Sequence, residues 1–390
     1  MKCQEVYEEI YHHEPEGIAF CPYRISPLGA HIDHQYGVIN GLAINKGINI
    51  AYHSKLNGVI ELQSLDFPKR VQFFVSAVPE NKENDWADYL RGATKVLNER
   101  YRLKMGLSGI IEGSLPIGGL SSSAAVTICF LSALCKVNDI HLKPEEMMAI
   151  AKKAENEYVG VSCGILDQAS EVLSRKDHLL FLDTKDNSYE LIPTNKNMKS
   201  YKIAIFFSGL ERALKNSKYN LRQDECKAAA YALLSYAGMD YDTFLNTRLR
   251  DVPKEVFETY KDKLPLNWLK RATHYYSEYE RAMKGTELWR EGKLEEYGKL
   301  VYESGKSSIE NYECGCKELI ELYNITTRTD GIYGARFSGA GFKGCLMALI
   351  DPDMAEYIED YVTKEYLKAF PELEGKYMFT LCESADGVIL

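Results

Sequence analysis

The chain of 390 residues is longer than one hydrophobic core usually organises, so its length predicts two domains. Its composition, 45% hydrophobic and 26% charged, is that of a globular protein, and its net charge of -9 argues against a nucleic-acid partner. No window reaches the roughly 18 apolar residues of a membrane span, and the acidic N-terminus lacks a signal-peptide core. The ten cysteines are scattered without zinc-site spacing, which predicts reduced thiols and a cytoplasmic protein with no membrane partner.

The first half of the chain predicts strands and helices in alternation. Gly37, Gly41 and Gly47 punctuate β-rich runs, which therefore predict short strands. Pro144 and Gly160 stand where a helix favours them, in the first turn and just past the end. Strands are expected at 18–52, 106–116 and 178–185, and helices at 85–105, 121–138 and 143–160. The helix at 121–138 is apolar on nearly every face, which predicts that it is buried.

A polar stretch over residues 185–200 predicts the domain boundary, which divides the chain into residues 1–190 and 191–390. The second half is expected to be α+β, with helical patterns dominating about 212–330. Runs typical of strands are 201–208, 335–341, 343–350 and 386–390.

The strongest local signal is GGLSSSAA at residues 118–125, between a predicted strand and a buried helix. Glycine and serine let a backbone close around phosphate oxygens, and the first-turn N–H groups of a helix attract an anion. The alternative interpretation is a flexible turn with an N-cap serine, although three consecutive serines exceed what a cap requires. The chain has no G-x-x-x-x-G-K-[ST] motif, so this is not the loop of a P-loop enzyme.

Residues 339–344 match G-x-G-x-x-G but do not predict a dinucleotide site. The run after Gly344 is strand-like and stops at Pro352, whereas a dinucleotide fingerprint opens a helix.

Three separated segments together resemble the galactokinases, members of the GHMP superfamily that also includes homoserine, mevalonate and phosphomevalonate kinases. They are RISPLGAHIDHQYG at 24–37, PIGGLSSSAA at 116–125 and GIYGARFSGAGFKGC at 331–345. Further similar segments are GVSCGILDQASE at 160–171, YNLRQDEC at 219–226 and RATHYYSEYERA at 271–282. The resemblance implies an α+β, two-domain GHMP-kinase-type fold: a ribosomal S5-like N-terminal α/β domain, a C-terminal α+β domain and a cleft between them. It also implies that ATP phosphorylates the anomeric hydroxyl of a galactose-like sugar.

The same resemblance assigns the catalytic pair. Asp167 matches the family's catalytic carboxylate, and Arg24 matches the arginine that contacts it and the transferring phosphate. A nearby guanidinium keeps an aspartate ionised and offsets charge on the phosphoryl oxygens. Asp167 then either removes the anomeric proton or orients and supports the nucleophile. The alternative interpretation of Asp167 is a helix cap or a surface acid.

Binding roles are implied in the same way. Ser123 and Glu155 match the family's Mg²⁺ ligands, and both are hard oxygen donors, although Glu155 also fits a solvated acid in KKAENE. The residues expected to contact the nucleotide are Ile117, Gly118, Gly119, Leu120, Ser121, Ser122, Ser123, Gly339 and Gly341. Those expected to bind the sugar are Ala30, His31, Ile32, Asp33 and Tyr219.

The chain departs from the galactokinase motif at the residue expected near the C6 hydroxyl. Galactokinases read G-E-H-x-D, whereas this chain has Ala30 in place of the Glu. The loss removes a charge-assisted hydrogen bond to galactose, worth on the order of 1.5–3 kcal/mol. A Glu about 4 Å from a C6 carboxylate would repel it by about 4 kcal/mol, roughly a thousandfold in affinity. Because PLGAHIDHQ also resembles the galacturonokinases of this family, Ala30 favours D-galacturonate as substrate.

A galacturonate substrate needs a partner for its carboxylate, and Arg212, His34 and Lys46 are the candidates. The opposing interpretation is a galactokinase that contacts C6 through water or another residue. The phosphate loop is also one residue shorter than the usual P-x-G-x-G-L-S-S-S, so we expect it to be tighter.

Two other classes of protein remain as alternatives. A sensor that binds sugar and ATP without turnover is disfavoured by the intact SSSAA string and by Asp167 and Arg24. A kinase of non-sugar alcohols is disfavoured by His31 and Asp33. A monomer or a homodimer is expected.

Overall fold

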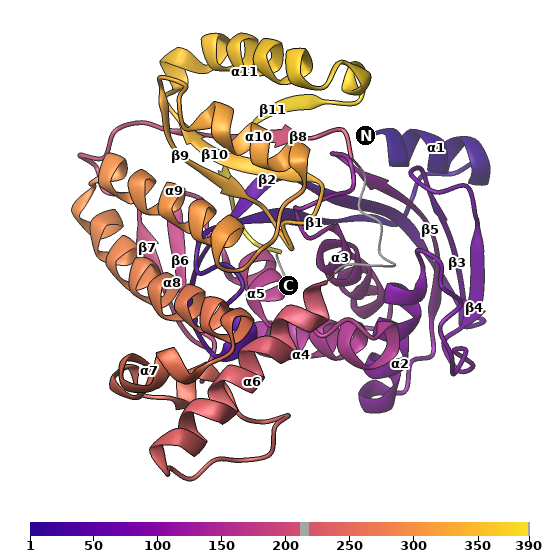
Figure 1. Ribbon diagram of the computed structural model, residues 1–390. Helices are drawn as coiled ribbons and strands as arrows, with labels where there is room; N and C mark the ends of the chain where they lie inside the picture. Colours follow the sequence, from indigo (N-terminus) through magenta and orange to yellow (C-terminus); the bar gives the residue numbers. More distant parts are fainter. Residues whose placement is uncertain (211–217, 389–390) are drawn as a thin grey trace.

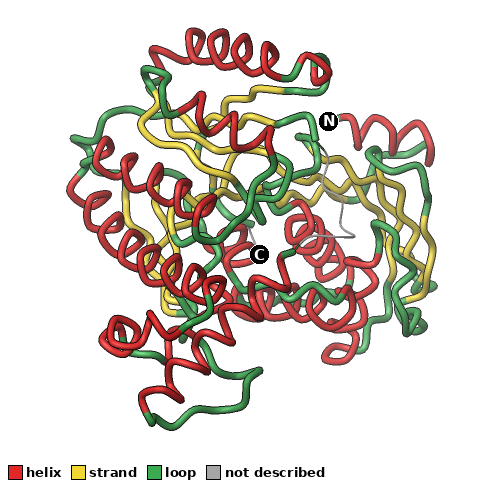
Figure 2. Tube along the Cα trace, viewed as in Figure 1, coloured by secondary structure: helices red, strands yellow, loops and turns green. Residues whose placement is uncertain are grey.

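The structure, a computed structural model, describes residues 1–210 and 218–388 and is built around two β-sheets (Figures 1 and 2). The strands of the first half are β1 (Gly17–Leu28), β2 (Val38–Lys55), β3 (Val59–Ser64), β4 (Val71–Phe74), β5 (Gly106–Gly113), β6 (His178–Asp183) and β7 (Ser188–Pro193). Those of the second half are β8 (Lys202–Phe207), β9 (Ile332–Phe337), β10 (Cys345–Ile350), β11 (Met378–Cys382) and β12 (Ser384–Ala385).

The helices surround these sheets. Those of the first half are α1 (Lys2–Tyr11), α2 (Asp88–Tyr101), α3 (Ser122–Val137), α4 (Pro144–Lys153) and α5 (Leu166–Leu173). Those of the second half are α6 (Tyr219–Ala237), α7 (Lys254–Tyr260), α8 (Leu266–Glu291), α9 (Leu294–Glu310), α10 (Lys317–Thr326) and α11 (Ala355–Ala369). Short 3₁₀ turns lie at Asp33–Gln35, Leu249–Asp251, Lys261–Lys263, Pro352–Met354 and Pro371–Leu373, and a π-helical turn continues α4 over Ala154–Val159.

The first sheet has the strand order β4-β3-β5-β2-β6-β7, and β1 and β12 also pair with β2. Its pairs are antiparallel except β3 with β5, which are parallel. Helices α3 and α5 pack on β1 and β2, and α2 and α4 pack on α3. Helix α1 contacts β2 and β5 through a small separate cluster that includes Ala51 and Ile110.

The second sheet is antiparallel, in the order β11-β8-β10-β9. Helices α9 and α10 pack on β9, and α11 packs on α10. Helices α8 and α9 lie side by side, and α8 also reaches β2 of the first sheet (Figure 1). The α+β prediction is therefore confirmed, and the two halves are joined by extensive packing.

Two expectations about strands are corrected. The run 38–55 is one long strand, because its glycines permit close packing where turns were expected. A Cβ at Gly47 would lie 2.0 Å from the carbonyl oxygen of Cys21, and one at Gly41 would lie 2.3 Å from Ser170 Oγ. Near the C-terminus, the described residues 386–388 of the predicted run 386–390 form no strand, since the N–H groups of Gly387 and Val388 instead donate to the carbonyl oxygens of Ser174 and Glu171 at the end of α5. Residues 389–390 of that run lie outside the described residues.

The predicted boundary at residue 190 falls inside β7, whose pairing with β6 continues to Pro193. The C-terminal strand β12 pairs with β2, so strands near both ends of the chain share one sheet. The division into two domains stays a prediction. Within the described residues, no helix is long and apolar enough to cross a membrane.

Candidate active site

The catalytic pair expected from the sequence forms an ion pair in the structure. Arg24 lies in the middle of β1, and Asp167 is the second residue of α5. Arg24 Nε donates to Asp167 Oδ1 at 2.8 Å, and its Nη1 donates to the carbonyl oxygen of Gly119 at 3.1 Å. The side chain of Arg24 is 3% exposed and that of Asp167 is 28% exposed. Asp167 is thus a partly exposed carboxylate that is paired with a buried guanidinium, so it is not an isolated surface acid.

The charge of Arg24 is secured by its partner. Burial alone would lower the pKa of this guanidinium, but the charge and hydrogen bond of Asp167 raise it above its ordinary value. Arg24 therefore stays protonated and can offset negative charge that develops on a phosphoryl group nearby.

The phosphate loop, residues 117–123, connects β5 to α3, and Ser122 and Ser123 open the helix. The Leu120 side chain is buried in the core, and its carbonyl oxygen accepts a hydrogen bond from the backbone N–H of Arg24 at 3.4 Å. Ser121 occupies the N-cap position with a φ of 62°, yet its hydroxyl makes no capping bond and has no partner among the described residues. A serine thus occupies the N-cap, as the alternative interpretation expects, but its side chain does not cap the helix. The first-turn N–H groups of α3 lie at this loop, as an anion site requires.

The third glycine motif packs on this loop, backbone against backbone. A Cβ at Gly118 would lie 2.9 Å from the Cα of Gly344, and one at Gly339 would lie 2.8 Å from the carbonyl oxygen of Gly119. Gly339 and Gly344 also have left-handed φ values of 65° and 100°. Gly341 instead faces Cys314, whose Sγ would be 3.0 Å from its Cβ. Of the two glycines predicted for the nucleotide, the structure brings Gly339 to the phosphate loop.

The sugar loop, residues 29–33, is held in place by several buried side chains. His31 has a φ of 61° and stacks on Tyr312, with ring centroids 4.2 Å apart and an interplanar angle of 6°. Burial, followed by the charge of Arg336, lowers the pKa of His31 well below its ordinary range, so the ring is neutral. The Ile32 side chain is fully buried among hydrophobic residues of the second half. The Ile32 side chain therefore anchors the loop, and a contact of Ile32 with the sugar stays a prediction.

Asp33 brings a second carboxylate to the catalytic corner. Its Oδ2 accepts a hydrogen bond from the backbone N–H of Leu166 at 3.3 Å. A Cβ at Gly164 would lie 1.9 Å from the same oxygen, so only glycine fits there. Burial, followed by the charge of Asp167, raises the pKa of Asp33. The sugar loop and the catalytic helix thus meet where Asp33 and Asp167 stand next to each other.

Comparisons with known proteins identify the family to which this site belongs. The model of the GHMP kinases N terminal domain matches residues 88–175, and that of the GHMP kinases C terminal domain matches residues 286–368. A galacturonokinase of Arabidopsis thaliana is 41% identical over 394 aligned positions, covering 95% of this chain and 92% of the relative. A galactokinase of Pyrococcus furiosus is 34% identical and covers 94% and 97%.

The chain belongs to the GHMP kinase family. Among its members it is an ATP-dependent sugar kinase of the galactokinase and galacturonokinase type. The crystal structure of Lactococcus lactis galactokinase complexed with galactose superposes with a TM-score of 0.89 at 26% identity, covering 99% of this kinase and 98% of that chain. Methanococcus jannaschii mevalonate kinase, at 17% identity and a TM-score of 0.65, shares the fold.

The kinase positions its sugar loop with a residue that the sequence did not single out, Glu278 of α8. Its Oε1 accepts hydrogen bonds from the N–H groups of Gly29 at 2.8 Å and Ala30 at 3.2 Å. Its Oε2 accepts one from Arg281 Nε at 2.8 Å. Burial would raise the pKa of Glu278, but the charges of Arg281 and then His274 lower it to about 2. The only sequence signal for Glu278 was its place in RATHYYSEYERA, which does not indicate where the side chain points.

The residues predicted to hold Mg²⁺ supply the right donors. Ser123 lies in the first turn of α3, and Glu155 lies in the π-helical turn after α4. Glu155 is 2% exposed, so the interpretation as a solvated helix acid is wrong. A hydroxyl and a carboxylate are hard oxygen ligands, and Mg²⁺ commonly completes its shell with phosphate oxygens and water. This donor chemistry fits the ion.

The structure places the three predicted partners of a C6 carboxylate in different surroundings. Arg212 lies outside the described residues. His34 is a neutral ring, because burial and then the charges of Arg248 and Lys227 lower its pKa to about 3. Tyr219 opens α6 with its ring 6.3 Å from that of His34, which keeps it near the sugar loop.

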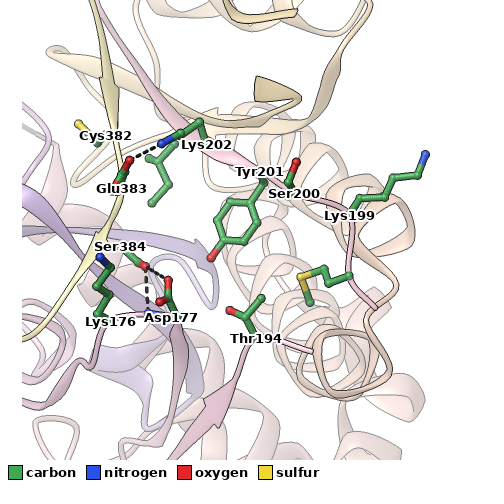
Figure 3. A pocket seen from close by; sticks show the side chains of 12 residues that line it. Lys176, Asp177, Thr194, Lys199, Ser200, Tyr201, Lys202, Cys382, Glu383 and Ser384 are labelled. Carbon is green, nitrogen blue, oxygen red and sulfur yellow. Dashed lines mark hydrogen bonds and ion pairs between the residues drawn. The ribbon is translucent and has the colours of Figure 1, made fainter. Parts of the chain in front are cut away.

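Lys46 belongs to a different part of the molecule. Its charge acts on Cys382, and Cys382 lines a pocket of about 400 Å³ beside the C-terminal segment (Figure 3). There the Lys202 ammonium pairs with Glu383, and Ser384 Oγ donates to Asp177 Oδ1 at 3.1 Å (Figure 3). None of the predicted sugar or nucleotide residues lines this pocket. The position of Lys46 argues against it as the partner of the carboxylate, whereas His34 is not a cation but keeps the hydrogen-bonding capacity of a neutral ring.

Proposed function

We propose that the kinase transfers the γ-phosphoryl group of ATP to the C1 hydroxyl of D-galacturonate, giving galacturonate 1-phosphate. The observation that carries this proposal is Ala30, a small, buried residue where the galactokinase motif has an acid. Its N–H group and carbonyl oxygen bond to Glu278 and His274, so the loop is fixed and presents no carboxylate at this position. The higher identity to a galacturonokinase, 41% against 34% for a galactokinase, supports the same substrate.

The chemistry proposed for the site follows from the Arg24–Asp167 pair. Asp167 accepts a hydrogen bond from the C1 hydroxyl and orients its oxygen toward the γ-phosphorus. The C1 oxygen forms the new bond to phosphorus, the bond to the bridging oxygen breaks, and ADP leaves with that electron pair while the hydroxyl proton is released. Arg24 offsets charge on the equatorial phosphoryl oxygens.

The remaining predicted residues bind and position the nucleotide. The backbone of the phosphate loop and the start of α3 bind the phosphates of ATP, beneath Gly339. Ser123 and Glu155 would hold Mg²⁺, which supplies positive charge to the phosphate oxygens. Asp33 is proposed to bind ring hydroxyls of the sugar from its place beside Asp167.

The test compares initial rates of ADP release with D-galacturonate and D-galactose, with Asp167→Asn as the blank. We expect kcat/KM to favour galacturonate, because position 30 offers galactose no charge-assisted bond and a carboxylate no repulsion. Ala30→Glu should reverse this preference, because it restores both terms. Preference of the unmodified kinase for galactose would refute the substrate assignment, and Ala30→Glu without effect on the ratio would refute its basis.

Galactose is the second candidate substrate, because the galactokinase complexed with galactose superposes over nearly the whole chain. A non-catalytic sensor is less well supported, since the Arg24–Asp167 pair and the serines of the phosphate loop are all in place. No turnover with either sugar, with binding of both sugar and ATP retained, would favour the sensor. The cytoplasmic location and the monomeric or dimeric state stay predictions.

A further inference from the structure

Arg336 of β9 is a buried arginine without an acidic partner among the described residues. Its side chain is 1% exposed. Over residues 1–210 and 218–388, its guanidinium makes one hydrogen bond, from Nη1 to the carbonyl oxygen of Ser26 at 3.4 Å, and Nε has no partner there. Over residues 1–210 and 218–388, no carboxylate oxygen lies within 4.0 Å of this guanidinium.

The other buried arginines of the described chain behave differently. Each is ion-paired: Arg24 with Asp167, Arg91 with Asp85 and Asp88, and both Arg222 and Arg271 with Glu225. Pairing is the rule because an isolated buried charge is strongly disfavoured. Arg336 therefore departs from the pattern of its own molecule, and its charge needs an explanation.

The nearest acid by its electrostatic effect, Glu278, is already committed. Its oxygens accept bonds from the sugar-loop N–H groups, from Ser304 Oγ at 2.6 Å and from Arg281 Nε. Arg281 neutralises Glu278, so two guanidinium groups share one carboxylate and one positive charge is left over. Burial lowers the pKa of Arg336 and the charge of Glu278 opposes this, which is the pattern of an incompletely matched cation.

The unmatched charge lies next to the sugar loop. The charge of Arg336 is, after burial, the largest influence that lowers the pKa of His31, the residue after Ala30. Arg336 also interacts with Cys314, whose Sγ lies 3.7 Å from His31 Nε2. A positive charge thus stands beside the segment where this kinase has Ala30 in place of an acid.

We propose that Arg336 is a specificity-determining residue, whose unmatched charge is completed by the carboxylate of the uronic-acid substrate. In a motif with Glu at this position, the protein itself would carry the anion beside the guanidinium. With Ala30 the anion arrives with the sugar, so a neutral hexose leaves the charge unmatched. This inference rests on the proposed galacturonate substrate and names the group that pairs with its carboxylate.

The first test measures charge pairing in the sugar-free protein. Ala30→Glu, Arg336→Gln and the double variant are compared with the unmodified kinase by urea unfolding. If the charges at positions 30 and 336 attract each other, Ala30→Glu should destabilise the protein less when Arg336 is present than in the Arg336→Gln background. The difference should be at least about tenfold in the unfolding equilibrium constant. Arg290→Gln, which removes a surface arginine paired with Glu190, is the matched control and should show no coupling to Ala30→Glu. Absent or opposite coupling between Ala30→Glu and Arg336→Gln would overturn the inference.

The second test measures discrimination between sugars. Arg336→Gln should raise KM for galacturonate on the order of tenfold to a hundredfold, with a smaller change for galactose. Arg336→Lys keeps the charge and should retain most of the preference, which separates a charge effect from a packing effect. Equal losses for both sugars in Arg336→Gln would overturn the role in specificity. If the unmodified kinase prefers galactose, the proposed substrate fails, while the sugar-free coupling still shows whether Arg336 faces position 30.

Discussion

Arg24→Lys separates the two functions that the structure gives to Arg24. The guanidinium bonds at once to Asp167, at 2.8 Å, and to the carbonyl oxygen of Gly119, at 3.1 Å. A lysine keeps the positive charge, but its single ammonium on a flexible stem lacks the planar fork that spans two acceptors. We expect Arg24→Lys to keep the ion pair and to lose the bond to the phosphate loop.

The size of the effect combines the lost contact with Gly119 and the proposed role of Arg24 in phosphoryl transfer. Loss of one neutral hydrogen bond costs about 0.5–1.5 kcal/mol of folding stability. Loss of a preorganised donor at the transferring phosphoryl group costs about 10²–10³ in kcat. The expected result is therefore a small fall in Tm together with a large fall in kcat. Initial-rate kinetics over a range of ATP concentrations and a thermal melt of the same preparation measure both quantities.

Arg290→Lys is the control, because Arg290 pairs with Glu190 at the surface and should change neither kcat nor Tm appreciably. A fall in kcat of less than tenfold, with a Tm loss as large as that of Asp167→Asn, would mean that Arg24 only holds β1 and α5 together. That outcome would refute the proposed role of Arg24 in phosphoryl transfer.

Three further changes test the surroundings of the site. Glu171 is fully buried, and burial, followed by the charge of Asp167, raises its pKa well above the ordinary range. The protonated Glu171 therefore stabilises the fold at low pH, and this stabilisation is lost as pH rises. The free energy of unfolding of Glu171→Gln, relative to that of the unmodified kinase, should rise by about 1.4 kcal/mol per pH unit above about pH 4.3. Urea unfolding from pH 5 to 7 measures this difference. Gly344→Ala puts a Cβ 2.7 Å from the carbonyl carbon of Gly118, so we expect about 1–3 kcal/mol of destabilisation and a raised KM for ATP. Tyr312→Phe removes the hydroxyl 3.2 Å from His34 Nε2 but keeps the ring, and should lower stability by about 1 kcal/mol in the same unfolding assay.

The contact between Arg24 and Asp167 was predicted from sequence although 143 residues separate them. The resemblance to the galactokinases implies this contact, because both residues match positions that the family pairs. The buried helix at 121–138 was equally accessible, since α3 is apolar around its circumference and few other structures suit such a segment.

Other features depend on packing that a single sequence does not reveal. Glu155 stands in a charged string typical of a solvated helix, but the turn it belongs to is π-helical and buries its side chain. The glycines of β2 favour breaks between strands by composition, whereas Gly47 is needed where two backbones approach closely. In both cases local composition favoured one structure, and tertiary contacts selected another.

Glu278 and Arg336 escaped prediction for a further reason, which concerns how the site is divided along the chain. Glu278 lies 248 residues from Ala30, whose backbone it holds, and Arg336 lies 310 residues from Ser26. The sugar loop belongs to the first half, but the groups that fix its backbone and its electrostatic environment come from α8 and β9. The phosphate loop of the first half likewise packs against Gly339 and Gly344 of the second half.

Because each ligand loop is completed by the opposite half, the charge at the sugar loop is a property of the whole chain and cannot be read from its motif. The change from Glu to Ala at position 30 removes one negative charge. The groups around this position are the guanidinium groups of Arg281 and Arg336 and the carboxylate of Glu278. The same change in a surrounding without Arg336 would only weaken the grip on a neutral sugar. Next to Arg336 it leaves an unmatched positive charge, which supports our proposal that the departure from the galactokinase motif favours a uronic acid.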